Sequence, residues 1–463
     1  MNEVRMLSTS GILGYGYAEE SLRIGMERAP HAADGGSTDP GPYYLGAGTS
    51  FCSRLSVKRD LRLMLIAAVA AKIPCIVGTS GGAGGEPHLQ DTAALVREIA
   101  REEGLSFRMA LIHAEQDKPS LIARVNAGKV RVLAKLAPLD AVTIERATRI
   151  VGMMGPEPIA RALDGGAQVI LCGRSSDPAQ WAAVAIRAGI APAPSWYAGK
   201  MLECGAEPTT PKEPDCLLVT VRDDHLICEP PNPIRRCTPL SVANFALHEN
   251  ASPIHHVEPG GLLDTSEVVF EAVSDRAVKV SGMSWTPAET YTVKLEGVEL
   301  SGYRAISICG TRDPVLISQI DDYLATHRAK VAAKAAAFGV PPSAYRMSIR
   351  TYGKDGVMAG WEKTPAITSH ELGFVLEVLA DTQDIANAVL AMARTSMLHA
   401  DFPGRLCKEG NMAFPFSPSD IPMGAQYRFS VFHVAAPADP YEMFPIEYET
   451  VTATAPQRVM AEA

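Results

Sequence analysis

Short apolar segments alternate with amphipathic segments over the first 200 residues, and a glycine-rich or polar loop follows each apolar segment. Residues 73–77, for example, form an apolar run that precedes the loop 78–85 and a helical pattern over 89–103. Strands that alternate with helices at this spacing predict a mostly parallel sheet flanked by helices. This alternation constrains the fold more than any other feature of the chain and places it in the α/β class.

The pattern changes twice along the chain, which indicates three segments. Residues 1–200 are predicted to form the α/β domain that carries the glycine-rich loops. Residues 201–310 are rich in proline and in strand-like runs, and we expect a β-rich segment there. Residues 311–463 return to alternating strands and helices, which predicts a smaller α/β domain with a C-terminal tail.

The composition excludes several classes of protein. The 463 residues are 47% hydrophobic and 21% charged, which is typical of a globular chain. A net charge of −9 with no stripe of Lys and Arg argues against nucleic-acid binding. The most apolar window, 61–77, is too short and too interrupted to span a membrane, and the N-terminus lacks a signal pattern. Nine scattered cysteines are typical of reduced thiols, so we expect a cytoplasmic protein.

Four loops follow predicted strands and therefore share one edge of the predicted sheet. They span 11–16, 78–88, 113–118 and 173–177. Ligands of open α/β sheets bind beyond the carboxyl ends of the strands. The sequence therefore predicts that these loops surround one ligand site.

The loop 78–85 suits an anionic group, because its glycine amides precede a helix whose dipole attracts negative charge. It lacks the Gly-Lys-Ser/Thr ending of a Walker A loop and is not a dinucleotide fingerprint, so a carboxylate or the phosphates of CoA fit better. Gly78 to Gly82 also match the pattern Gly-x-Ser-x-Gly after a strand. A hydrolase with Ser80 as its nucleophile is therefore an alternative.

Candidate site residues come from these loops and from polar segments elsewhere. The acid/base candidates are Asp39, His88, Glu115 and Asp117. The substrate-binding candidates are Ser37, Thr38, Tyr43, Lys58, Arg59, Thr79, Ser80, Gly81, Gly82, Gly84, Arg174, Ser175, Asp177, Asn411 and Ser417.

Each candidate also has a structural interpretation. Asp117 and Asp177 stand where helix caps stand, and His88 suits a bonded position at a helix start. Asn411 and Ser417 suit a docking loop between domains. The pair Glu115 and Asp117 also suits a divalent cation, but the residues select no particular cofactor.

The chain resembles the acyclic terpene utilisation (AtuA-like) family over nearly its whole length. The resemblance rests on 14–17, 36–46, 57–61, 81–85, 114–118, 173–177, 293–297 and 411–420. The segment 241–250 departs from the family, which has His in place of Phe245 and Tyr in place of His248. Some members carry a further small C-terminal domain, so the resemblance implies a small separate partner subunit here.

The resemblance implies a role in the catabolism of acyclic terpenes, whose acids are degraded as CoA thioesters. Together with the predicted anion site, it favours a cytosolic enzyme acting on a small carboxylic acid or its CoA thioester. We expect a lyase of the hydratase/dehydratase kind in a homo-oligomer. An alternative of another class is a non-catalytic subunit of a catabolic complex that binds acyl ligands or acts as a scaffold.

Overall fold

The computed structural model describes residues 3–28, 32–34, 41–133, 135–248, 251–406 and 408–453. The chain divides into two compact units. Unit 1 comprises residues 1–299 and 429–463, and unit 2 comprises residues 300–428. These limits differ from those of the three segments expected from the sequence. Four strands within residues 217–281 and the strand 446–451 extend the main sheet of unit 1, so these segments belong to that unit.

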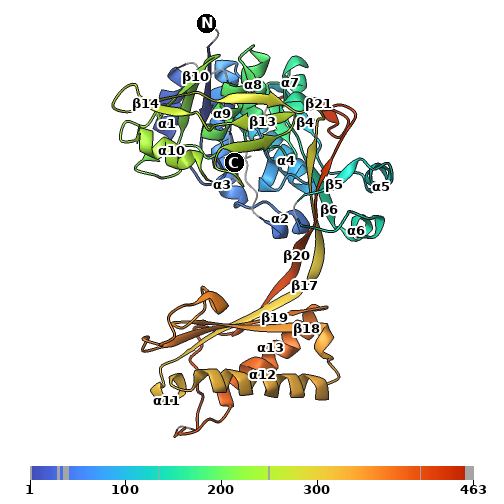
Figure 1. Cartoon of the computed structure of the whole chain (residues 1–463), viewed down its shortest axis with the longest axis vertical. Coiled ribbons are helices and arrows are strands. Elements are labelled where there is room, and N and C mark those ends of the chain that lie inside the picture. The colour runs from blue at the N-terminus through green and yellow to red at the C-terminus, as the bar shows by residue number, and fades with distance from the viewer. Residues whose placement is uncertain are drawn as a thin grey trace, which may run out of the picture. The chain divides into compact units, whose positions relative to one another are not determined.

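Unit 1 is built on a mixed sheet with helices on both faces (Figure 1). In sheet order, its strands are β14 (Val269–Ala272), β15 (Val278–Ser281), β10 (His225–Glu229), β9 (Leu217–Val221), β1 (Val4–Ser8), β2 (Ala32–Asp34), β3 (Cys75–Val77), β7 (Val169–Cys172), β4 (Phe107–Ile112) and β21 (Ile446–Val451).

Only the centre of this sheet is parallel. Strands β1, β2, β3, β7 and β4 pair in parallel, and the strands on either side of them pair antiparallel. The α/β class is thus confirmed, but the sheet as a whole is mixed rather than mostly parallel. The added strands follow connections that no local sequence pattern reveals.

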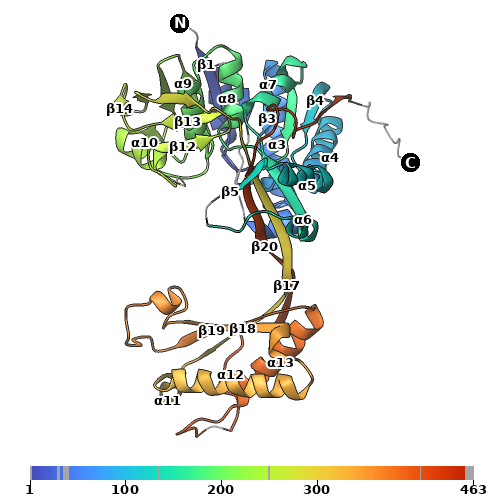
Figure 2. The same cartoon turned by 45° about the vertical axis from the view of Figure 1, so that its right-hand side comes forward.

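Helices cover the sheet because each buries an apolar stripe. Helices α3 (Arg54–Ala71) and α4 (Glu86–Glu103) pack on one face, where Leu65, Val96 and Leu171 belong to one core. Helices α7 (Pro156–Asp164), α8 (Ala179–Arg187) and α9 (Pro192–Leu202) pack on the other face (Figure 2). Helix α9 is buried on all sides from Ala193 to Leu202, so the residues at its end are held firmly.

The remaining elements of unit 1 are short. Its other helices are α1 (Glu19–Glu27), α2 (Pro42–Ala47), α5 (Lys118–Asn126), α6 (Ala141–Arg146) and α10 (Pro239–Ala246), with a 3₁₀ turn over Ser80–Gly82. Small sheets are formed by β8 (Thr209–Thr210) with β11 (Arg236–Cys237), and by β12 (His255–Glu258), β13 (Gly261–Asp264) and β16 (Ser284–Pro287).

Two long strands belong to both units. Strand β17 (Val293–Thr311) pairs with β6 (Arg149–Met153) in unit 1, and β20 (Asp420–Ala435) pairs there with β5 (Val130–Val132). In unit 2, β17 pairs with β19 (Leu372–Ala380), which pairs with β18 (Tyr345–Tyr352).

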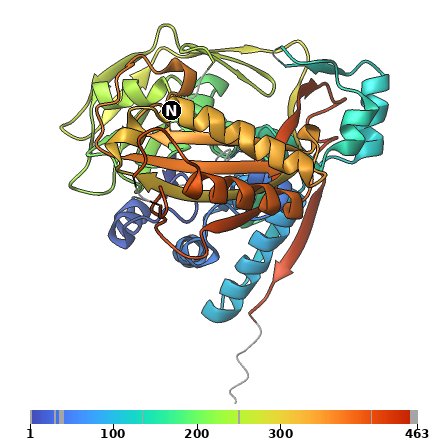
Figure 3. The ribbon, with the colours of Figure 1, turned by 90° about the horizontal axis from the view of Figure 1, so that it is seen from below.

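Unit 2 has its own apolar core between this sheet and two helices. Helices α12 (Ile320–Ala337) and α13 (Gln383–His399) lie side by side on one face of the sheet, after the short α11 (Pro314–Ile317) (Figure 3). None of the helices within the described residues combines the length and apolarity that a bilayer crossing requires.

Candidate functional site

The loops that follow β3, β4 and β7 contact one another. The backbone N–H of Ser175 donates to Oγ1 of Thr79 (3.2 Å), and the Ser175 hydroxyl donates to the carbonyl of Gly78 (2.7 Å). The N–H of Glu86 donates to Oε2 of Glu115 (2.8 Å). These bonds lie at the carboxyl edge of the parallel strands, where the sequence predicted that the loops would meet.

The glycines of the loop 78–85 serve close packing. Gly84 adopts a φ of +68°, and a Cβ there would lie 2.4 Å from the backbone nitrogen of Arg174. The cavity beside Gly81 and Gly82 holds about 20 Å³, which is room for about one water molecule. The loop 78–85 thus packs tightly against the loop 173–177. The small cavity beside it has no room for an anionic ligand.

Ser80 and His88 are fully buried in this packing. The Ser80 hydroxyl has no hydrogen-bond partner among the residues that the structure describes, whereas a nucleophile elbow presents its serine to a pocket. Nε2 of His88 lies 3.1 Å from the carbonyl oxygens of both Tyr44 and Thr49, so it ties the end of α2 to the start of α4. Burial lowers the pKa of His88, which keeps the ring neutral.

Glu115 and Asp117 are held apart by separate structural bonds. Glu115 accepts the N–H of Glu86 at the start of α4, and burial raises the pKa of this carboxyl. Asp117 is exposed and caps α5 by accepting the N–H of Ser120 (2.9 Å), which lowers the pKa of Asp117. The contacts of Asp117 are those of a helix cap.

Arg174 and Asp177 are bonded to each other and to the chain. Nη1 of Arg174 lies 3.1 Å from Oδ1 of Asp177, and Nε lies 3.0 Å from Oε2 of Glu296. The Arg174 side chain is buried. The anion that it binds is thus a carboxylate of its own chain.

The basic candidates of α3 also bind acidic groups or carbonyls nearby. Lys58 bridges Glu98 and Glu102 of α4 at 2.6 and 2.7 Å. Arg59 donates to the carbonyl of Tyr17 (2.8 Å) and to the buried carboxylate of Asp60 (2.9 Å).

The other candidates lie elsewhere. Tyr43 is 40% exposed and contacts the Tyr44 ring edge-on. Ser37, Thr38 and Asp39 lie outside the described residues, so their predicted roles stay predictions.

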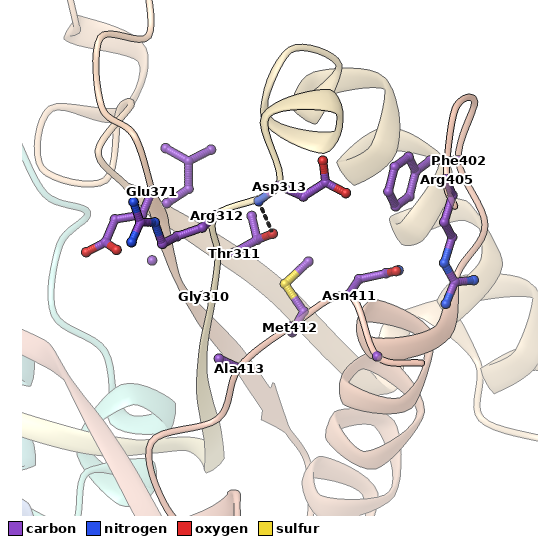
Figure 4. A pocket seen from close by; sticks show the side chains of 13 residues that line it. Gly310, Thr311, Arg312, Asp313, Glu371, Phe402, Arg405, Asn411, Met412 and Ala413 are labelled. Carbon is purple, nitrogen blue, oxygen red and sulfur yellow. Dashed lines mark hydrogen bonds between the residues drawn. The ribbon is translucent and has the colours of Figure 1, made fainter. Parts of the chain in front are cut away.

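Asn411 lines a cavity of about 710 Å³ within unit 2 (Figure 4). Its amide donates to the carbonyl of Ala400 (2.7 Å) and to the Tyr323 hydroxyl (3.2 Å). The Arg405 guanidinium in the same wall donates to the carbonyls of His399 and Glu409. Asn411 and Arg405 thus hold the segment that follows α13, while Thr311, Arg312, Asp313 and Glu371 also line the cavity. Ser417 is exposed and is not among the residues that line the cavity.

A further cavity, of about 310 Å³, lies within unit 1 beside the loop that follows β1. It is lined by Ser10, Ile12, Tyr15, Cys204, Glu207, Lys212, Pro214, Ser241, Asn244, Phe245 and His248. Gly11, with a φ of +75°, lets this loop approach closely, since a Cβ there would lie 2.5 Å from the carbonyl carbon of Cys204. The cavity thus lies beyond the carboxyl end of a central strand, where α/β sheets bind ligands.

One end of this cavity is a cluster of ionisable side chains. Nε2 of His248 lies 3.7 Å from Sγ of Cys204 and 3.3 Å from Oε1 of Glu203. The buried ammonium of Lys200 forms an ion pair with the same Glu203 carboxylate. Burial lowers the pKa of His248, but the bond with Glu203 outweighs this effect, so the net shift is upward. We regard this cavity as the candidate active site.

Sequence reasoning missed this cluster because its parts come from distant segments. Glu203 and Cys204 follow the buried helix α9, and His248 follows α10, 44 residues beyond Cys204. One local signal was available: a Lys and a Glu three residues apart at the end of an otherwise apolar helix. Burial of a charged pair is costly, and active sites are places where ionisable groups are buried despite this cost.

In the comparison with known families, residues 56–212 match the model described as "Acyclic terpene utilisation family protein AtuA", which confirms over this segment the resemblance recognised from the sequence. The matched segment includes Glu203, Cys204, Glu207 and Lys212. Comparisons with curated proteins and with solved structures gave no match.

Proposed function

We propose that this chain, whose residues 56–212 match the AtuA family, is a catabolic enzyme that acts on a small carboxylic acid or its CoA thioester in the cavity of unit 1. The reaction is of the hydratase/dehydratase kind. The observation that carries the proposal is that apolar walls, a cationic side chain, a carboxylate and a cluster of ionisable groups line one cavity of about 310 Å³.

The apolar walls suit a short branched chain. Ile12, Pro214 and Phe245 line the cavity, and its volume lies at the lower end of the range for small-molecule sites. Such a cavity accommodates the acyl part of a thioester, while the CoA portion would extend outside it.

The Lys212 ammonium supplies the charge that an acid requires. Its side chain is 68% exposed and forms an ion pair with Glu207, which also lines the cavity. Lys212 can attract a substrate carboxylate, and Glu207 is then the carboxylate positioned to accept a proton.

Hydration of an enoyl group adds a hydroxyl to the β-carbon and a proton to the α-carbon, and dehydration removes both. In this proposal Glu207 transfers the proton at the α-carbon. The cluster at Cys204 and His248 polarises the substrate oxygen at the other end of the cavity.

The test is a screen of branched hydroxy-acids and enoyl-acids, both free and CoA-linked, with product analysis by mass spectrometry. Turnover by the purified chain, lost in Glu207→Gln and kept in the exposed control Glu145→Gln, is the expected result. Thermal stabilisation by these acids without turnover would contradict the enzyme and favour the non-catalytic acyl-binding subunit. Neither turnover nor stabilisation would contradict both functions.

A further inference from the structure

The side chains of Glu203, Cys204 and His248 converge on one point at the end of the cavity. Their ligand atoms (a carboxylate oxygen, Sγ and an imidazole nitrogen) all lie within 4.8 Å of one another. We propose that these three residues bind a zinc ion. The binding itself does not depend on the proposed function, although its catalytic role does.

The distances match the edges of a tetrahedron around zinc. With Zn–S of about 2.3 Å and Zn–N of about 2.0 Å, a tetrahedral S–N edge is about 3.6 Å, and the corresponding N–O edge is about 3.4 Å. The observed separations are 3.7 Å between Sγ of Cys204 and Nε2 of His248, and 3.3 Å between Nε2 and Oε1 of Glu203. These two edges already have nearly the spacing that the ion requires, and the third, between Sγ and the carboxylate oxygen, is no longer than 4.8 Å.

The His248 ring is oriented as a zinc ligand is. Its Nδ1 faces the backbone carbonyl of Phe245 and donates to it when protonated. In the neutral ring, that bond places the lone pair on Nε2, the nitrogen that lies near Cys204 and Glu203. A backbone carbonyl that holds the distal ring nitrogen is the usual support of a metal-bound histidine.

The charges of the ligands match the charge of the ion. A thiolate and a carboxylate cancel the two positive charges of zinc, and the imidazole is neutral. Oε1 of Glu203 faces both the Lys200 ammonium and Nε2 of His248, so zinc would displace the ammonium from this oxygen. Lys200 can then bind the second oxygen of the carboxylate.

Three protein ligands would leave one position open on the ion. Because Cys204 and His248 both line the cavity and Glu203 is buried, we expect the open position to face the cavity. A zinc ion with three protein ligands and an open fourth position is typical of catalytic sites, while structural sites are closed by four ligands. In the proposed reaction the ion would polarise the substrate oxygen at this end of the cavity.

Metal binding can be measured without any substrate. The chain is stripped with a chelator and titrated with ZnCl₂, and the bound zinc is counted by elemental analysis. One zinc per chain is expected, with affinity at least about 100-fold lower in Cys204→Ser and in His248→Gln. The half-buried Cys52 and the exposed His255 provide matched controls, so Cys52→Ser and His255→Gln should bind as the unaltered chain does.

Titration with CoCl₂ identifies the thiolate. A Cys204–cobalt bond gives a sulfur-to-metal charge-transfer band in the near ultraviolet, and the band should be absent in Cys204→Ser. Circular dichroism verifies that each variant is folded. The proposal is overturned if the unaltered chain binds no zinc, or if the two ligand variants bind it as tightly as the controls do.

These outcomes separate the site from the function. Zinc binding without turnover of any acid would contradict the hydratase/dehydratase reaction and leave the site standing. Turnover by a chain that binds no zinc would contradict the zinc site and leave the proposed reaction standing.

Discussion

Arg174 and Glu296 form a buried ion pair, in which Nε of the arginine lies 3.0 Å from Oε2 of the glutamate. Their side chains are 5% and 3% exposed, and they come from positions 122 residues apart in the sequence. Burial raises the pKa of Glu296, but Arg174 and Lys294 lower it more, to about 2. The pair therefore joins the loop after β7 to the start of β17 as two full charges.

Removal of one partner should destabilise unit 1 strongly. Glu296→Gln leaves the Arg174 charge buried without its main partner, which costs about 3 kcal/mol of unfolding free energy. The exposed pair Arg187–Asp164 is the control, and Asp164→Asn should cost about 0.5 kcal/mol or less. Urea denaturation followed by tryptophan fluorescence measures both changes. Equal losses of unfolding free energy in the two variants would show that the buried pair contributes no more to stability than the exposed pair.

Glu258 should make the stability of the protein fall as the pH rises. Burial raises the pKa of Glu258 to about 8, despite the opposing hydrogen bond from Ser176. Between its ordinary pKa of 4.5 and this value, the carboxyl is protonated in the folded chain and ionised in the unfolded chain. The folded state then binds more protons, so the contribution of Glu258 is fully present below pH 4.5 and is lost as the pH rises through 8.

The variant Glu258→Gln removes this dependence. It should be about as stable as the unaltered chain at pH 5 and about 2–4 kcal/mol more stable at pH 9. Urea denaturation of both proteins across this range measures the difference. A difference that stays constant with pH would mean that Glu258 ionises normally in the folded chain.

Substitution of Asp117 should change the stability of the protein and should not change its turnover. Its side chain accepts the N–H of Ser120 and caps α5. Asp117→Ala should therefore lower the melting temperature by about 1–3 °C, while Asp117→Asn, which can still cap, should be nearly neutral. Turnover or acid binding should be unchanged in both variants. A large loss of turnover in Asp117→Asn would restore the acid/base role that the sequence alone favoured.

The sequence was informative about topology and less so about chemistry. Alternating strands and helices predicted the parallel centre of the sheet and the meeting of the loops after β3 and β7, because backbone geometry decides both. The sequence did not show whether a loop glycine allows close packing or binds a ligand. A positive φ at Gly84 serves contact with Arg174, and the same residue would serve a phosphate equally well.

The candidate site depends on contacts that no local pattern encodes. Cys204 follows α9 and His248 follows α10. The departure of the segment 241–250 from the family pattern singled out Phe245 and His248 but gave no link to Cys204. Their proximity follows from how α9 and α10 pack on the antiparallel strands. Buried charges such as Arg174 likewise find their partners only once the chain has folded.

Lys212 should determine the preference for acids over uncharged analogues. Its ammonium lies in the cavity wall and is paired only with the carboxylate of Glu207 among the ion pairs of the described residues, so it can also attract a substrate carboxylate. Lys212→Ala should raise the KM for a free acid by about 3- to 10-fold, and it should leave the KM for the corresponding amide unchanged, because the lost attraction acts on charge alone. Steady-state kinetics with the two substrates measures this difference, and Lys334→Ala, at an exposed position of α12, is the matched control. An equal rise for acid and amide would show that Lys212 supports the shape of the cavity rather than binding the carboxylate.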